Sequence, residues 1–212
     1  MKEFILHIET APLPMADLII KAPSFKAASN LKDATKITED IERKKNKYFE
    51  DAAYNEATGF VCATALLDTA TGERELTHSF HMSEEGMLRK LYERLTKPYA
   101  STITFRGTKF IYPFIARRAA IYSDMNFFTN VFYKYRTAIL EDETHTDLAK
   151  MWACGAISHP ETIKEITDVL DIPLTQSVVP CHKLLTEERL AEAEDHLNLT
   201  LDTLMQVFTK LA

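Results

Sequence analysis

Long hydrophobic runs and clustered cysteines are both missing from this sequence of 212 residues. No apolar stretch approaches the roughly 20 residues that a membrane-spanning helix needs, so we expect no membrane partner. The three cysteines (Cys62, Cys154 and Cys181) are scattered and predict no disulfide framework. The N-terminus also lacks a basic segment followed by an apolar one. Together these absences predict a soluble protein of the reducing cytoplasm.

Glycine and proline are scarce, with 5 and 8 residues, which excludes the fibrous and disordered classes. Hydrophobic residues make up 46% of the chain and charged residues 26%, enough for a proper core. The formal net charge of -6 argues against broad electrostatic adhesion to nucleic acid, so any such contact must be confined to a local groove. Because no linker is visible, residues 1–212 are expected to form a single domain.

The segment Glu3–Pro14, EFILHIETAPLP, is typical of a buried strand that ends in a Pro-x-Pro turn. Two polar residues, His7 and Glu9, lie inside its apolar run. Because side chains alternate along a strand, both project from the same face. Partial solvation or a basic partner would explain Glu9 by itself, so the meaning of the pair depends on the rest of the chain.

Helix-like and strand-like segments alternate through the rest of the chain, which favours an α/β architecture. Gly107 is expected to permit a sharp turn before Pro113. The predicted strands are Gly59–Leu67 and Arg74–Phe80, joined as a hairpin, and Thr102–Phe105, while Phe127–Tyr135 is either a strand or an aromatic loop. The predicted helices are Lys36–Ala53, one capped by Ser83, Pro113–Tyr122, one beginning at His145–Leu148, one from Pro160 to before Pro173, and one from a Thr186 cap to Leu211. Ala16–Ala34 and the stretch from Pro173 to Lys183 are expected to be irregular.

Four stretches resemble motifs of the predicted 3′-5′ exonucleases related to the proofreading domain of family B DNA polymerases. They read LHIETAPLP (Leu6–Pro14), RGTKFIYP (Arg106–Pro113), HTDL (His145–Leu148) and HLNLT (His196–Thr200). The resemblance implies an α/β ribonuclease H-like fold, with a central mixed β-sheet flanked by α-helices. In that DEDD group, four carboxylates hold two divalent metal ions that activate water. Matched motif by motif, the four acids fall on His7, Glu9, Ile111 and Thr200, and the residue that positions the water falls on His196.

One acid of the four is therefore retained in this chain. A carboxylate, an imidazole, an aliphatic group and a hydroxyl cannot neutralise two hard metal ions, so we expect two-metal catalysis to be lost and no cofactor to be bound. Glu9 and His196 would then be vestigial catalytic residues. In an alternative, His7, Glu9 and Asp147 form a rearranged site for one transition-metal ion, and the chain is an active exonuclease that uses Mg²⁺ or Mn²⁺. In the plainest alternative, His7 is an ordinary hydrogen-bonded residue.

The turn that follows the third predicted strand adds positive charge. Arg106 stands where the resembled motif has asparagine, and Lys109 is close by, so a phosphate could be held there without a metal while Tyr112 stacks on a base. Alternatively, the basic pair is simply solvated and the aromatic residues belong to the core. Three functions follow: a degenerate exonuclease that binds single-stranded nucleic-acid ends, an active exonuclease with a rearranged site, or a scaffold that binds another protein.

Overall fold

The computed structural model describes residues 2–95, 100–122, 144–155, 160–174 and 179–212. The chain forms two compact units, one made of Met1–Glu9 with Val61–Ala212 and the other of Thr10–Phe60. The predicted segment Phe127–Tyr135 lies outside the described residues.

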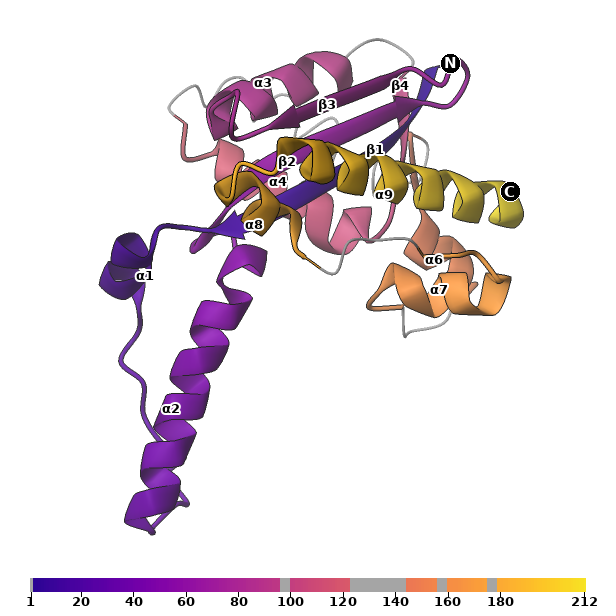
Figure 1. Cartoon of the computed structure of the whole chain (residues 1–212). Coiled ribbons are helices and arrows are strands. Elements are labelled where there is room, and N and C mark those ends of the chain that lie inside the picture. The colour runs from indigo at the N-terminus through magenta and orange to yellow at the C-terminus, as the bar shows by residue number, and fades with distance from the viewer. Residues whose placement is uncertain (1, 96–99, 123–143, 156–159, 175–178) are drawn as a thin grey trace. The chain divides into compact units, whose positions relative to one another are not determined.

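The described strands form one five-stranded sheet in the order β3-β2-β1-β4-β5 (Figure 1). Strand β1 pairs parallel with β4, β4 pairs parallel with β5, and β2 pairs antiparallel with β3. The strands are β1 (Lys2–Pro12), β2 (Gly59–Asp68), β3 (Arg74–His78), β4 (Ala100–Thr104) and β5 (His145–Asp147). The sheet is mixed and helices flank it, so the predicted α/β class is confirmed at this level.

The hairpin β2–β3 follows the prediction closely, because its turn chemistry is local. The Asp68 carboxylate accepts backbone N–H groups from Ala70 at 3.0 Å and Thr71 at 3.2 Å. Gly72 takes a left-handed conformation with φ 74°, which suits glycine. The register then pairs Leu67 with Arg74.

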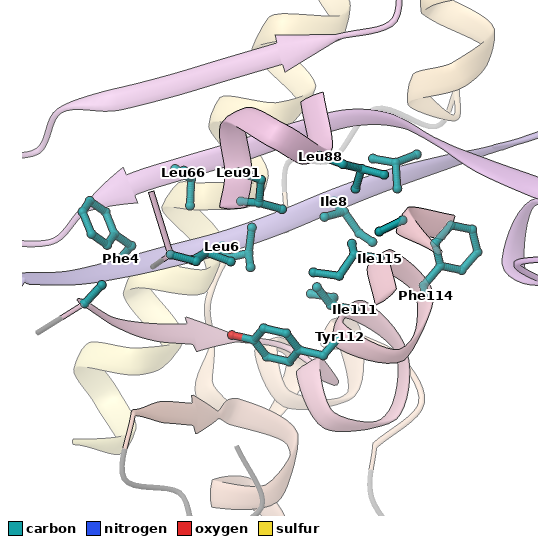
Figure 2. Close-up of a cluster of buried hydrophobic side chains, with 14 residues drawn as sticks. Phe4, Leu6, Ile8, Leu66, Leu88, Leu91, Ile111, Tyr112, Phe114 and Ile115 are labelled. Atoms are coloured by element: carbon teal, nitrogen blue, oxygen red, sulfur yellow. The ribbon is translucent and has the colours of Figure 1, made fainter. Parts of the chain in front are cut away.

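One face of the sheet packs on helices α3 (Glu84–Leu95) and α4 (Tyr112–Ala119). As predicted, Ser83 caps α3, since its hydroxyl accepts the Gly86 N–H at 3.2 Å. Figure 2 shows the apolar cluster between these elements, to which β1 contributes the alternating residues Phe4, Leu6 and Ile8. Because of the alternation, His7 and Glu9 project from the opposite face of β1.

Helix α9 (Leu190–Leu211) lies on that opposite face and buries an apolar stripe that includes Leu197, Leu201 and Leu204. Its polar contacts run along β3, where Arg74 pairs with Asp202 at 2.5 Å and His78 lies 3.6 Å from Glu194. Helices α6 (Leu148–Ala153), α7 (Ile163–Leu170) and α8 (Cys181–Thr186) contact α9. The sheet is therefore covered by helices on both faces.

The predicted boundaries of the C-terminal elements are wrong at two points. Helix α8 occupies Cys181–Thr186, half of which, Cys181–Lys183, was expected to be irregular. The chain then leaves helical geometry at Glu188, whose φ is 57°, so α9 begins at Leu190 and Thr186 is not its cap. A left-handed residue cannot continue a right-handed helix, so the predicted helix starts later than its expected cap.

The smaller unit contains α1 (Met15–Lys21), α2 (Ala34–Glu50) and the 3₁₀ turn η1 (Asp51–Tyr54). Helix α1 was missed, because Ala16–Ala34 was expected to be irregular. In α2, Asp40 is buried and pairs with Lys44 at 2.9 Å and with Arg43. Hydrogen bonds from these two residues hold the pKa of the Asp40 carboxyl well below its ordinary value. Two basic residues of α2, Arg43 and Lys44, are thus paired within this unit.

Candidate functional site

The candidate site lies where the parallel strands of the larger unit end. Strands β1, β4 and β5 share one direction, so their carboxyl ends meet at the same edge of the sheet. The strands that follow β1 in the chain, β2 and β3, lie on one side of it, whereas β4 and β5 lie on the other. Open α/β sheets bind ligands at such a switch in strand order. His7 and Glu9 lie on β1 just beyond the level at which its neighbour β4 ends, and Arg106 follows β4.

Three of the predicted residues meet at this edge. Glu9 Oε1 lies 2.9 Å from His7 Nε2 and 3.0 Å from His196 Nε2, so one carboxylate oxygen binds two imidazoles. His7 and Glu9 share a face of β1, and His196 reaches them from α9. The side chains of His7 and Glu9 are each 22% exposed, and that of His196 is 9% exposed. The cluster is therefore largely buried, and His7 and Glu9 are more exposed than His196.

Two opposing effects set the pKa of Glu9. Burial raises it, and hydrogen bonds from His196 and His7 lower it by more, to about 2. Glu9 is therefore ionised at neutral pH and can only accept hydrogen bonds. It follows that each imidazole donates its Nε2–H to the carboxylate, which leaves the Nδ1 atom of a neutral ring as an acceptor.

His196 is not arranged to bind a metal ion through Nε2. A histidine that binds a metal usually donates its other ring N–H to an acceptor. If His196 bound a metal through Nε2, its proton would move to Nδ1, which is buried and has no hydrogen-bond partner among the described residues. Within the same ranges, no group of three or more His, Cys, Asp or Glu residues is arranged to hold a metal ion. In this arrangement the Nε2 atoms of His7 and His196 are both used in hydrogen bonds to Glu9 Oε1.

Asp147, the third residue of the alternative metal site, is used elsewhere. It is 3% exposed and caps α6 by accepting the Ala149 N–H at 3.1 Å. Its oxygens also accept the Arg106 N–H at 2.9 Å, the Thr108 N–H at 3.0 Å and the Thr108 hydroxyl at 2.9 Å. These four hydrogen bonds occupy both oxygens. Asp147 fixes the turn that follows β4 and has no lone pair directed at a ligand.

The geometry of that turn corrects the expected role of Gly107. The left-handed residue is Arg106, with φ 58°, and Gly107 is not left-handed. Gly107 is needed for a different reason: a Cβ there would lie 2.0 Å from Thr104 Oγ1 and 2.6 Å from His145 Nε2. Those two atoms are hydrogen-bonded to each other at 2.8 Å. The glycine therefore permits a close approach of the backbone to a buried polar pair.

The three residues predicted to bind nucleic acid differ in how much solvent reaches their side chains. Lys109 is exposed. Arg106 is 31% exposed, and its Nη1 lies 2.9 Å from both the carbonyl and a carboxylate oxygen of Glu161. Tyr112 is 4% exposed, with its hydroxyl bonded to Thr102 and its ring edge-on to His145 at 4.8 Å. Thus Lys109 and part of Arg106 face solvent, while the Tyr112 ring is packed in the interior.

The other two motif positions are Ile111 and Thr200. Ile111 is 3% exposed and belongs to the apolar cluster of Leu6 and Ile8, on the α3 side of the sheet (Figure 2). Thr200 is buried on α9, one turn after His196, and its hydroxyl donates to the His196 carbonyl at 2.9 Å. Of the four motif positions, His7 and Glu9 meet, and Ile111 points into the core.

Sequence reasoning missed three groups whose pKa values the charge of Glu9 affects. Burial raises the pKa of the Cys181 thiol to about 12, and the charge of Glu9 adds to the shift. Burial also raises the pKa of Cys62, with further contributions from Cys181 and Glu9. Burial and Lys183 lower the pKa of His182, against the effect of Glu9. Both cysteines were noted as isolated residues, and only the tertiary fold brings them within electrostatic reach of the carboxylate.

A buried ion pair on the α3 side was also missed. Glu84 accepts the Val61 N–H at 2.7 Å, two N–H groups of Arg118 at 2.9 and 2.6 Å, and the Tyr122 hydroxyl at 2.5 Å. Both charged residues are less than a tenth exposed. The available signal was Arg118, a charged residue on the apolar stripe of α4 beside Phe114 and Ile115. The network joins α3, α4 and β2 on the α3 side of the sheet.

Comparison with family models and with curated proteins identifies no family for this chain. None of the described helices has the length and apolar character needed to cross a membrane. No family model matches the chain, and no match was found among curated proteins.

Proposed function

We propose that this chain is a ribonuclease H-like domain that binds the end of a single nucleic-acid strand and lacks two-metal hydrolysis. The observation that carries the proposal is the Glu9 cluster. At the edge where ligands bind in α/β sheets, the one retained acid is held by His7 and His196. The mixed sheet with helices on both faces is compatible with the proposed fold.

The loss of two-metal catalysis follows from the donors at this edge. Two divalent ions need several carboxylate oxygens between them. Glu9 already accepts two N–H groups, Asp147 accepts four donors, and Ile111 is an aliphatic residue in the core. We therefore expect no shortening of a single strand in Mg²⁺ or Mn²⁺.

Binding would rest on the turn after β4. Asp147 fixes the backbone of Arg106 and Thr108, so the turn that carries Lys109 is held in place. The Arg106 guanidinium is held by Glu161, whose own side chain is 74% exposed, so a phosphate could displace it. Contacts of this kind position a strand without reading its sequence. With a net charge of -6 on the chain, the binding should be weak and sensitive to salt.

Fluorescence anisotropy tests this proposal with a labelled single-stranded oligonucleotide at low salt, with and without chelator. We expect binding that chelator leaves unchanged and that Lys109→Ala or Arg106→Ala weakens several-fold. Lys164→Ala is the matched control, because Lys164 is an exposed lysine of α7 that pairs with Asp168 at 2.6 Å. Absence of binding at low salt, or equal loss in the control variant, would overturn the proposal.

A second candidate function, a protein-interaction scaffold, is favoured by one observation in the smaller unit. Helix α1 exposes three large apolar side chains, with Met15 59%, Ile19 61% and Ile20 82% exposed. Apolar residues grouped on a short helix are typical of interaction sites. Light scattering of the wild type and an Ile20→Lys variant tests whether this surface drives self-association, and an unchanged mass in both would exclude that form of the scaffold.

A further inference from the structure

The side chain of Arg106 starts from a fixed and strained backbone position. Its φ of 58° is left-handed, a conformation that residues other than glycine rarely adopt. The N–H of Arg106 donates to Asp147 Oδ1 at 2.9 Å, and this hydrogen bond holds the conformation. Strained residues of this kind persist where the surrounding contacts fix them, and they cluster at functional sites. The strain therefore directs attention to the partners of the Arg106 guanidinium.

The guanidinium is bound by Glu161, the residue that lies two positions before α7. Arg106 Nη1 lies 2.9 Å from the carbonyl oxygen of Glu161 and 2.9 Å from one of its carboxylate oxygens. The Glu161 side chain is 74% exposed. Because water solvates both charges of such a pair, the pair contributes little to stability. The carboxylate can therefore leave Arg106 at a small cost in free energy.

A second carboxylate, that of Glu165, is fixed nearby. Its Oε1 accepts the N–H groups of Glu161 and Thr162, each at 2.9 Å, and the Thr162 hydroxyl at 3.1 Å. The hydrogen bond from the Thr162 N–H is the main cause that lowers the pKa of Glu165, and the charge of Arg106 adds a smaller part. Arg106 thus faces two negative charges, of which Glu165 is held by the helix cap and Glu161 can turn away.

We propose that Glu161 is an internal competitor of phosphate: its carboxylate occupies Arg106 in the free protein, and a phosphate of the bound strand has to displace it. This inference rests on the proposed function and adds a residue that sets the affinity of the same site. Carboxylate and phosphate oxygens accept the same guanidinium N–H groups, so they exclude each other at Arg106. Glu161 acts through Arg106 and does not contact the strand.

The sign of the effect separates competition from support. If Glu161 positioned Arg106 for the strand, removing its charge would weaken binding. If Glu161 competes with the strand, removing its charge strengthens binding. Glutamine at position 161 keeps the backbone N–H that donates to Glu165 and the carbonyl that accepts from Arg106, and it weakens only the contact through the side chain.

The test is fluorescence anisotropy with the full chain and a labelled single-stranded oligonucleotide, at low salt and in chelator. An exposed ion pair changes an equilibrium by a few-fold, so we expect Glu161→Gln to bind the strand about 2- to 5-fold more tightly than wild type. The gain should disappear in the Arg106→Ala background, where the double variant should bind as weakly as Arg106→Ala alone. Circular dichroism checks that each variant is folded, and Glu161→Ala provides a second form of the same test.

Asp168→Asn is the matched control. Asp168 is an exposed acid of α7 that pairs with Lys164 at 2.6 Å, so the variant also removes one negative charge and releases one cation on the same helix. It should bind the strand as wild type does, because neither residue belongs to the turn after β4. An equal gain in this control would show that the effect of Glu161→Gln comes from net charge.

The outcomes distinguish this inference from the proposed function. If neither wild type nor Glu161→Gln binds the oligonucleotide, the proposed function is wrong and this inference is wrong with it. If wild type binds and Glu161→Gln binds equally or more weakly, strand binding stands and the competition is overturned. A gain that persists without Arg106, or that Asp168→Asn reproduces, overturns the competition as well.

Discussion

Replacing Glu9 with glutamine tests the charge on which the cluster depends. Glutamine keeps the shape of the side chain and one carbonyl acceptor, but removes the negative charge. His7 and His196 would then donate to a neutral oxygen in place of a carboxylate. Hydrogen bonds to charged groups are roughly twice as strong as those between neutral groups, so the anchor between β1 and α9 should weaken.

The expected magnitude follows from the pKa of Glu9, which lies at about 2 against an ordinary value of 4.5. Because a tenfold change in an equilibrium is about 1.4 kcal/mol, the folded state favours the ionised carboxylate by about 3 kcal/mol. The side chain is 22% exposed, and solvent screening reduces this contribution. We therefore expect Glu9→Gln to lower the free energy of unfolding at pH 7 by about 2 kcal/mol.

The pH dependence gives the sharper signature. Since the pKa of Glu9 is lower in the folded state, its contribution is fully present above pH 4.5 and is lost as the pH falls toward 2. The difference between wild type and Glu9→Gln should therefore be largest at pH 5 to 7 and shrink toward zero near pH 2. Other carboxyls with lowered pKa, such as Asp68, occur in both proteins and cancel in the difference.

Urea unfolding at a series of pH values from 2 to 7 measures this difference, with the fluorescence of Trp152 as a probe of the larger unit. Glu93→Gln is the control for removing a surface charge and should stay within about 0.5 kcal/mol of wild type. A difference between wild type and Glu9→Gln that is constant across the pH range, or that lies below about 0.5 kcal/mol throughout, would refute the reasoning.

Three further substitutions test the surroundings of the site. Asp147→Asn replaces a carboxylate that accepts four hydrogen bonds, so we expect the free energy of unfolding in urea to fall by about 3 kcal/mol. Hydrogen exchange at the Arg106 and Thr108 amides should also become faster. Unchanged exchange would contradict the anchoring role of Asp147. Gly107→Ala should cost about 1 to 3 kcal/mol, because the added methyl group meets a buried polar pair, and a neutral effect would exclude the close approach. Ile111→Asp buries a charge in the apolar cluster, so we expect the free energy of unfolding to fall by more than about 3 kcal/mol. Calorimetry should detect no Mn²⁺ binding by this variant. A folded variant that binds Mn²⁺ would show that position 111 faces the site.

The elements that the sequence predicts well are those with local causes. The Asp68 turn, the Ser83 cap and the alternation in β1 each depend on residues within a few positions of one another. The break at Glu188 was not predictable in the same way, because the stripe of α9 continues in phase through Leu190 while the backbone turns left-handed just before it. A hydrophobic period reports which face is buried and does not report where a helix starts.

The contacts of the candidate site were less predictable, because they join distant parts of the chain. Glu9 and His196 are 187 positions apart, and Glu84 and Arg118 are 34 apart. The resemblance drew attention to Glu9 and His196, but not to the shared oxygen. Asp147 illustrates the remaining difficulty: the same carboxylate is a plausible metal ligand in the sequence and a saturated helix cap in the fold.

The histidine at position 7 changes how the negative charge of Glu9 is stabilised. In the site that the resemblance implies, an acid at this position would place a second negative charge beside Glu9, and cations would be required to keep both ionised. Here the neighbour is an imidazole that donates a hydrogen bond at 2.9 Å, and His196 donates a second at 3.0 Å. These two donors hold the pKa of Glu9 at about 2 without a metal. The two imidazoles thus supply the electrostatic stabilisation that metal ions would give an acidic site.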